Sequence, residues 1–174
     1  MKTLIVTGGT GGLGSVVVPR LEREYRCVLL GRGETISGEA YGLVHMAGGW
    51  EGGTVSATTD DAWERMIGLN LSLSFRMVRD AVKTLTRPGR IIAISSIATQ
   101  TNGKDSAAYV IAKKGLNALI EATAAEVAGT GLTANALLPA TLDARLREAV
   151  ADSILFLLSD SAANINGALI PVTA

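Results

Sequence analysis

Tyr109 and Lys113 are the residues whose types and spacing most directly suggest acid–base chemistry. They are four positions apart, so they share one face of any helix that contains both. A free tyrosine titrates near ~10, and a neighbouring ammonium group lowers that pKa because it favours the phenolate. We expect Lys113 to act in this way, so that Tyr109 can give a proton to a carbonyl oxygen or take one from an alcohol. Taken alone, such a pair is usually part of an ordinary helix surface, with the lysine stem lying along it.

Ser96 and Asn70 provide two further polar groups. Ser96 directly follows the apolar run Arg90–Ser95. If that run is a strand of a parallel sheet, Ser96 lies at the carboxyl edge, where such sheets bind ligands, and its hydroxyl can bond a reacting oxygen. Taken singly, Ser96 could instead cap a turn, and Asn70 could be a solvated position within a helix.

The segment Thr7–Gly14 (TGGTGGLG) contains five glycines in seven positions. It follows a short apolar run and precedes a stretch with helical spacing. In that setting, glycines allow a tight turn and a close approach of a diphosphate to the free N–H groups at a helix start. A tight turn alone would need only one or two glycines, so the segment indicates nucleotide binding.

Apolar runs alternate with longer amphipathic stretches along the chain. This alternation predicts an α/β fold, a Rossmann-like doubly wound parallel sheet with helices on both faces. Strands are expected at Lys2–Val6, Arg26–Gly31, Tyr41–Met46, Arg90–Ser95, Leu132–Leu138 and Ala168–Thr173, and helices at Leu13–Tyr25, Asp60–Leu85, Ser106–Ala128 and Leu142–Leu158. No linker or repeat divides the chain, so one NAD(P)-binding domain is expected over residues 1–174.

These motifs, in this order, resemble the short-chain dehydrogenase/reductase family, of its classical type. Tyr109-x-x-x-Lys113 matches the family's signature pair and follows Ser96 by thirteen residues. His45-Met46-Ala47-Gly48 stands where the family has Asn-Asn-Ala-Gly, and the segment ending at Pro139 resembles the one that flanks the nicotinamide.

The resemblance implies a role for each matching residue. Tyr109 would be the acid/base, Lys113 would also hold the nicotinamide ribose, Ser96 would orient the substrate, and Asn70 would anchor a water that passes protons to Lys113. The cofactor-binding set implied is Gly8, Thr10, Gly11, Gly12, Leu13, Gly14, Arg32, His45, Ala47, Gly48, Tyr109, Lys113, Pro139 and Leu142. His45 would line the cofactor cleft without taking part in the chemistry.

Arg32 bears on the choice of cofactor. In such folds an acidic residue after the second strand binds the ribose hydroxyls of NAD, whereas a basic residue accommodates the extra phosphate of NADP. Gly31 stands where the acid would be and Arg32 follows it. The sequence therefore favours NADP(H) over NAD(H), although Arg32 could instead cap a surface turn.

The chain departs from the family between Arg32 and His45. Only twelve residues lie between them, where the family places a strand and its flanking helices. Gly33–Ala40 should therefore be an extended connection, the second strand should be an exposed edge, and the face left bare should need cover by another subunit. The segment Thr141–Arg147, which forms a substrate lid in the family, is also short, so an open site is expected.

Composition excludes several classes of protein. The 16 basic and 16 acidic residues balance, which gives no electrostatic footprint for nucleic acid. One Cys and one His exclude a Cys-based zinc site and a multi-His metal site. No apolar stretch approaches the length of a membrane span, and a cytoplasmic protein is the default expectation.

The resemblance implies an NAD(P)-dependent oxidoreductase that reduces a carbonyl or oxidises a secondary alcohol. It also implies a homodimer or homotetramer that associates through the two long helices. Two alternatives remain open. The chain could be a catalytically idle nucleotide-binding or interaction module, because it has lost part of the adenine pocket and the lid, or it could be a structural subunit that partners a full-length homologue.

Overall fold

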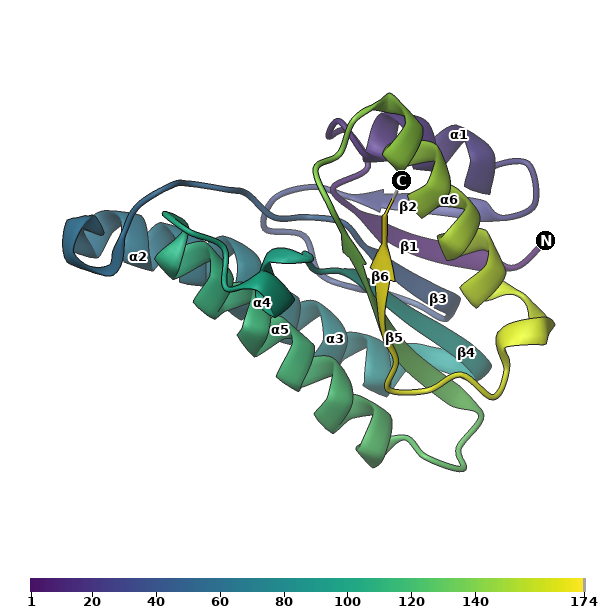
Figure 1. Ribbon diagram of the computed structural model, residues 1–174. Helices are drawn as coiled ribbons and strands as arrows, with labels where there is room; N and C mark the ends of the chain where they lie inside the picture. Colours follow the sequence, from purple (N-terminus) through teal and green to yellow (C-terminus); the bar gives the residue numbers. More distant parts are fainter. Residues whose placement is uncertain (174) are drawn as a thin grey trace.

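A computed structural model describes residues 1–173 of the chain. Six strands form one parallel sheet in the order β2-β1-β3-β4-β5-β6. They are β1 (Thr3–Thr7), β2 (Arg26–Leu30), β3 (Ala40–His45), β4 (Leu85–Ile94), β5 (Leu132–Pro139) and β6 (Leu169–Val172). The predicted doubly wound parallel sheet, with no further strand beside β2, is confirmed (Figure 1).

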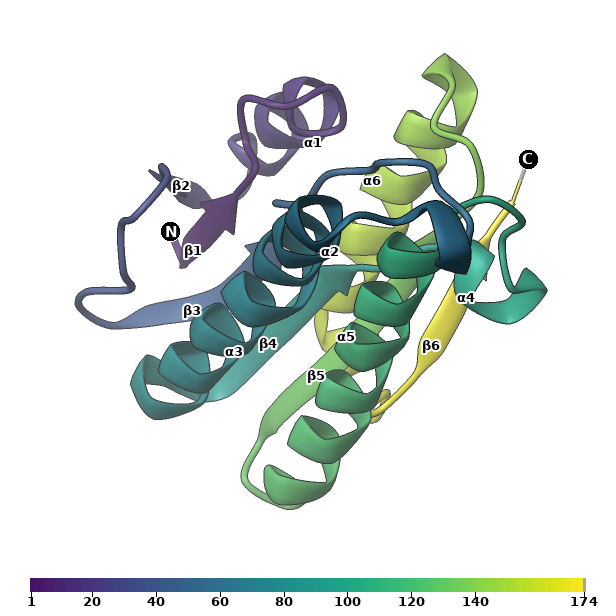
Figure 2. The same ribbon diagram turned by 90° about the vertical axis from the view of Figure 1, so that its left-hand side faces the viewer.

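Helices cover both faces of the sheet (Figures 1 and 2). One face carries α1 (Gly14–Leu21) and α6 (Ala144–Leu158), and the other carries α2 (Asp60–Ile67), α3 (Leu73–Thr84) and α5 (Ala107–Glu126). Each face has its own apolar cluster: Leu4, Val17 and Ile154 belong to the first, and Ile5, Leu116 and Ile120 to the second. The alternation of β1 side chains between the two clusters is what a strand buried on both faces requires.

The long helix predicted from Asp60 contains an irregular turn. A π-helical turn, η2 (Gly68–Ser72), separates α2 from α3. The Asn70 side-chain amide donates to the Met66 carbonyl at 3.1 Å. That carbonyl is the one an α-helix would offer to the backbone N–H of Asn70, so the side chain competes with regular helix geometry there. Single π turns of this kind occur often at functional sites.

Other predicted boundaries need correction. The helix after the glycine-rich loop ends at Leu21 rather than Tyr25, because residues 22–24 form a closing turn. Strand β4 starts at Leu85, so Pro88 and Gly89 lie inside it, and α6 starts at Ala144, where Asp143 caps it. A short helix, α4 (Ala98–Thr101), and two 3-10 turns, at Val55–Ala57 and Asp160–Ala162, were not predicted.

The connection between β2 and β3 contains no helix, as expected from its length. Gly33 and Gly38 adopt positive φ values of 84° and 79°, which glycine tolerates without strain. The expectation of a bare sheet face is only partly right. Ile36 of this connection is buried and packs in the cluster that includes Val28 and Leu30 of β2, so one side chain replaces part of the missing helix.

Candidate active site

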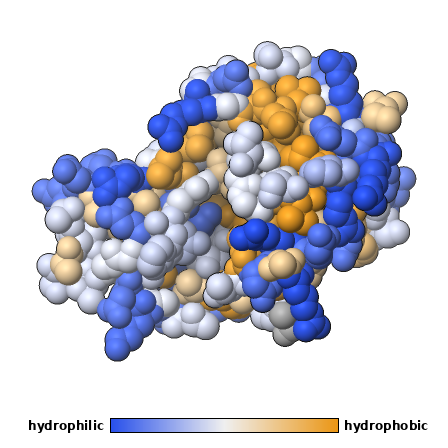
Figure 3. All heavy atoms as spheres, turned by 90° about the horizontal axis from the view of Figure 1, so that it is seen from above, coloured by the Kyte–Doolittle hydropathy of each residue, from blue (hydrophilic) through white to orange (hydrophobic). Residues whose placement is uncertain are grey.

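A cavity of about 250 Å³ opens at the carboxyl end of the sheet. Asn70, Ser96, Tyr109 and Lys113, the four residues predicted to be catalytic, all line it. Of the residues predicted to bind cofactor, Leu13, Pro139 and Leu142 also line it, together with Trp50 and Met46. Apolar side chains gather near the middle of this side of the molecule, surrounded by polar ones (Figure 3). The cavity therefore offers an apolar wall and a small set of polar groups, which is typical of small-molecule sites.

Lys113 is buried in the helix α5 and points toward the end of β4. Its Nζ donates to the Ile94 carbonyl at 2.8 Å and lies 5.9 Å from the centroid of the Tyr109 ring. Burial lowers the pKa of Lys113 to about 8. The ammonium form still predominates at pH 7, so Lys113 contributes a positive charge to the lining of the cavity.

The pKa of Tyr109 differs from the expectation. Burial raises it, and the Ser96 hydroxyl acts in the opposite direction with a smaller effect. Lys113 does not lower it here, because its ammonium group is directed at the Ile94 carbonyl rather than at the phenol oxygen. Tyr109 is therefore a protonated phenol at neutral pH, ready to donate.

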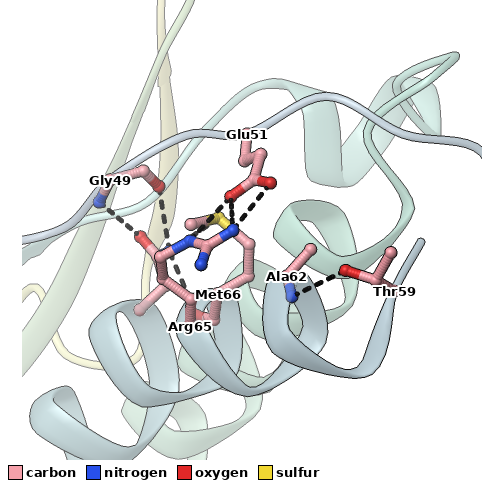
Figure 4. A network of polar contacts seen from close by, with 7 residues as sticks. Gly49, Glu51, Thr59, Ala62, Arg65 and Met66 are labelled. Atoms are coloured by element: carbon pink, nitrogen blue, oxygen red, sulfur yellow. Dashed lines mark hydrogen bonds and ion pairs between the residues drawn. The ribbon is translucent and has the colours of Figure 1, made fainter.

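Asn70 is fixed by the loop that follows β3. Its Nδ2 donates to the Gly49 carbonyl at 2.9 Å, and its Oδ1 accepts from the Gly49 N–H at 3.2 Å. Figure 4 shows Gly49 on the far side of Arg65 and Met66 from the start of α2, where Thr59 accepts from the Ala62 N–H, and it shows Glu51 accepting hydrogen bonds from Arg65. The side-chain amide is thus held in one orientation by backbone groups.

Gly48 packs directly against the site. A Cβ at this position would lie 2.7 Å from Asn70 Oδ1 and 3.3 Å from Lys113 Nζ. Only glycine allows this loop to approach both side chains so closely. Gly48, which belongs to the predicted cofactor-binding set, is therefore required for the observed positions of Asn70 and Lys113.

The glycine-rich loop joins β1 to α1. Gly8 has a φ of 71°, and a Cβ on it would lie 2.6 Å from the Ala47 nitrogen. A Cβ on Gly14 would lie 2.4 Å from the carbonyl oxygens of Gly8 and Gly9. Thr10, Gly11 and Gly12 are exposed, so the tip of the loop offers open backbone to a ligand.

His45 lies beneath the cleft instead of on its surface, which corrects the expectation that it lines the cofactor site. It is fully buried at the end of β3. Its Nδ1 lies 2.7 Å from Thr7 Oγ1 and its Nε2 lies 2.9 Å from Ser74 Oγ. Ala47 is half-buried, and its N–H donates to Thr7 Oγ1, the same oxygen that contacts His45.

The hydrogen bonds assign the histidine tautomer. The Ser74 hydroxyl donates its proton to the Asn70 carbonyl at 2.8 Å, so it can only accept from His45. Nε2 therefore carries the hydrogen, and Nδ1 accepts from the Thr7 hydroxyl. This buried chain connects the end of β1, through His45, to the π-helical turn that carries Asn70.

Arg32 is exposed just beyond the end of β2. Its neighbour Glu34, which no motif indicated, accepts from the Gly31 N–H at 2.5 Å through its carboxylate. An acidic group therefore does stand at the end of this strand. Glu34 lies three residues beyond Gly31, inside the shortened connection, whereas the family pattern places the acid directly after the strand.

Comparison with known proteins gives this site its context. A sequence model described as "short chain dehydrogenase" matches residues 34–154. The chain belongs to the short-chain dehydrogenase/reductase family. The matched range contains the four cavity residues, and the glycine-rich loop precedes it.

Curated family members are longer than this chain. A 3beta-hydroxysteroid dehydrogenase from Mediterraneibacter gnavus is 30% identical over 84% of this chain and 68% of its own length. The 3-oxoacyl-[acyl-carrier-protein] reductase FabG from Salmonella typhimurium is 32% identical over 66% of this chain and 48% of its own length. The chain thus spans between about half and two thirds of these relatives.

Solved structures of the family share the fold over almost the whole chain. A short-chain dehydrogenase/reductase from Brucella melitensis superposes with a TM-score of 0.86 and 19% identity, covering 98% of this chain and 94% of its own. A 4-hydroxyisoleucine dehydrogenase complexed with NADH and succinate gives 0.83 and 21%, covering 97% and 96%. In the part of the chain that the structure describes, no helix is long and apolar enough to cross a membrane.

Proposed function

We propose that this protein is an NAD(P)-dependent oxidoreductase that reduces a carbonyl or oxidises a secondary alcohol. The observation that carries the proposal is the convergence of Asn70, Ser96, Tyr109 and Lys113 on one cavity. The four residues come from three separate elements, the π-helical turn, the end of β4 and the helix α5, so their meeting is a property of the whole fold.

The loop residues fit a dinucleotide. The exposed tip at Thr10, Gly11 and Gly12 leaves room for a diphosphate near the start of α1, where N–H groups and the helix dipole favour an anion. Leu13, Pro139 and Leu142 provide an apolar wall for a nicotinamide ring. Gly8, Ala47 and Gly48 keep the neighbouring backbone close to the cleft. When bound, the dinucleotide supplies or accepts the hydride.

The side chains of the cavity handle the proton. In the reducing direction Tyr109 donates its O–H proton to the substrate oxygen as the carbonyl carbon gains the hydride. Ser96 hydrogen-bonds the same oxygen and orients it. Because Lys113 does not lower the pKa of Tyr109 here, we assign its ammonium group to the nicotinamide ribose, as the family resemblance implies, with Asn70 anchoring the water that passes protons to it. The proton donor needed in the reducing direction is populated at neutral pH, although burial raises the pKa of Tyr109 and makes it a weaker acid than a free phenol.

A titration of the purified protein with NADPH and, separately, NADH tests this function. We expect a dissociation constant below about a millimolar. Calorimetry can measure it, and so can intrinsic tryptophan fluorescence, since Trp50 lies at the cavity. Binding of neither cofactor would favour the alternative, a catalytically idle interaction module. The reason for that alternative is the short connection after β2, where part of the family's adenine pocket is missing. In this connection Ile36 is buried against the sheet.

Cofactor choice rests on two neighbouring charges of opposite sign. We propose NADP(H) over NAD(H), with Arg32 binding the 2′-phosphate and Glu34 opposing it. Arg32→Gln should weaken NADPH binding about tenfold with little effect on NADH, because one charge-assisted contact to phosphate is lost. Glu34→Gln should strengthen NADPH binding, because an anion is removed from the same strand end. Tighter binding of NADH than NADPH to the wild type would disprove the Arg32 assignment.

We also propose that the protein forms a homodimer or homotetramer through the outer faces of its long helices. Trp63, Phe75 and Ile111 are 39%, 50% and 45% exposed on α2, α3 and α5. Large apolar side chains that remain exposed on one helical layer are typical of an interface. Size-exclusion chromatography with light scattering should give a discrete homo-oligomer. An aggregated chain would instead favour a subunit that needs a longer homologue as its partner.

A further inference from the structure

The side chain of Arg147 reaches from α6 across to the glycine-rich loop. A Cβ placed on Gly12 would lie 3.5 Å from Arg147 Nη2 and 3.6 Å from Cζ. The Nε atom is buried and has no hydrogen-bond partner among residues 1–173. A guanidinium group held over an exposed, glycine-lined backbone without a partner for its Nε atom is unusual, because buried donors are nearly always satisfied.

The start of α6 holds Arg147 in this place. Only residues 140–143 separate β5 from α6, so the helix begins close to the carboxyl end of the sheet. The Asp143 side chain accepts from the Leu146 N–H at 2.7 Å and fixes the first turn. Leu146 is buried in the same cluster as Leu13 and Val17, so the turn is anchored on α1.

Neighbouring acidic groups are already committed elsewhere. Arg20 of α1 donates to Glu148 at 2.9 Å and also pairs with Asp152, which ties α1 to α6. Asp143 serves as the helix cap. Within the described chain, no carboxylate lies in ion-pair range of Arg147. Its charge is thus available to an external anion.

We propose that Arg147 binds the diphosphate of the nicotinamide dinucleotide at the glycine-rich loop, beside Gly12. This inference rests on the proposed function and names a residue for it. The planar guanidinium can bond two phosphate oxygens at once, and the exposed backbone of the loop would supply N–H groups to the same anion. The short segment after Pro139 brings α6 near enough to do this, so a fixed cation closes the phosphate site where the chain lacks a long lid.

Arg147→Gln removes the charge and keeps much of the side-chain volume, and Arg145→Gln is the matched control. Arg145 is exposed on the same turn of α6 and forms no ion pair in the described structure. We expect Arg147→Gln to weaken NADPH and NADH binding alike by about tenfold or more, since charge-assisted phosphate contacts are strong. Arg145→Gln should bind as the wild type does. Calorimetry measures both, and circular dichroism checks that the variants fold.

Inorganic diphosphate separates this inference from the proposed function. Diphosphate should raise the unfolding temperature of the wild type. This rise should be lost in Arg147→Gln and partly kept in Arg147→Lys, which retains the charge but not the planar guanidinium that bonds two oxygens at once. Equal dinucleotide binding by Arg147→Gln and wild type would overturn the role of Arg147 and leave the oxidoreductase intact. If diphosphate binding depends on Arg147 but no dinucleotide binds, the role of Arg147 as a diphosphate ligand is supported and the proposed oxidoreductase function is overturned. If the wild type binds neither probe, both proposals fall.

Discussion

Tyr109→Phe should lower turnover by about a thousandfold while leaving cofactor binding and folding nearly unchanged. The substitution removes one hydroxyl from the cavity and keeps the ring that packs above Lys113. General acid catalysis by a positioned side chain contributes about 10²–10⁴-fold, and among residues 1–173 no other phenol lines the cavity to replace it. The decrease should appear in the rate of NADPH oxidation, followed by absorbance, with whichever carbonyl compound the wild type reduces.

Tyr25→Phe is the matched control, because Tyr25 stacks on Tyr41 near the opposite end of the sheet. It also removes a phenolic hydroxyl but should leave turnover unchanged. Fluorescence titration of each variant with NADPH distinguishes a chemical defect from lost binding. Full turnover by Tyr109→Phe would contradict the assigned acid, and the absence of any reducible carbonyl for a cofactor-bound wild type would favour the idle module.

Local patterns explain why so much of the site could be predicted. The spacing of Tyr109 and Lys113 fixes their relative placement once α5 forms, because positions four apart on a helix are neighbours. Ser96 could be placed because the end of an apolar run marks the edge of a parallel sheet. The parallel sheet likewise followed from short strands alternating with long amphipathic stretches, and the position of β2 at its edge followed from the deletion after Arg32.

Other features depend on contacts between distant residues, which no single pattern reveals. Ile36 covers the sheet beside β2 because the shortened connection folds back over it. Arg147 reaches the glycine-rich loop only because Arg20 and Leu146 dock α6 on α1. The pKa of Tyr109 depends on where the Lys113 ammonium group points, and a helix-face argument does not specify that direction.

His45 shows how such a distant contact affects function. The motif match placed it at the cleft, but its ring bonds Thr7 and Ser74 below the surface. Its real role in the structure is to hold the end of β1 against the π-helical turn that carries Asn70. The residue therefore supports the predicted site through its neighbours, with no contact to the cavity.

This buried position makes stability sensitive to acid. Burial, with a smaller contribution from the Lys113 charge, lowers the pKa of His45 to about 3. The unfolded chain takes up that proton near its ordinary value of ~6.5, so between these two values the unfolded state binds more protons. The contribution of neutral His45 is fully present above pH ~6.5 and is lost as the pH falls toward 3. At pH 5 the free energy of unfolding should be about 2 kcal/mol lower than at pH 7 from this group alone.

His45 is the only histidine in the sequence, so this titration can be assigned without ambiguity. His45→Gln keeps a neutral polar side chain but cannot take up the proton. It should lower stability at pH 7, because a fully buried and doubly bonded ring is replaced, yet it should flatten the change between pH 7 and pH 5. Urea unfolding at the two pH values measures both effects. An equally steep decrease in the variant would show that the acid sensitivity arises elsewhere and that His45 is not buried in its neutral form.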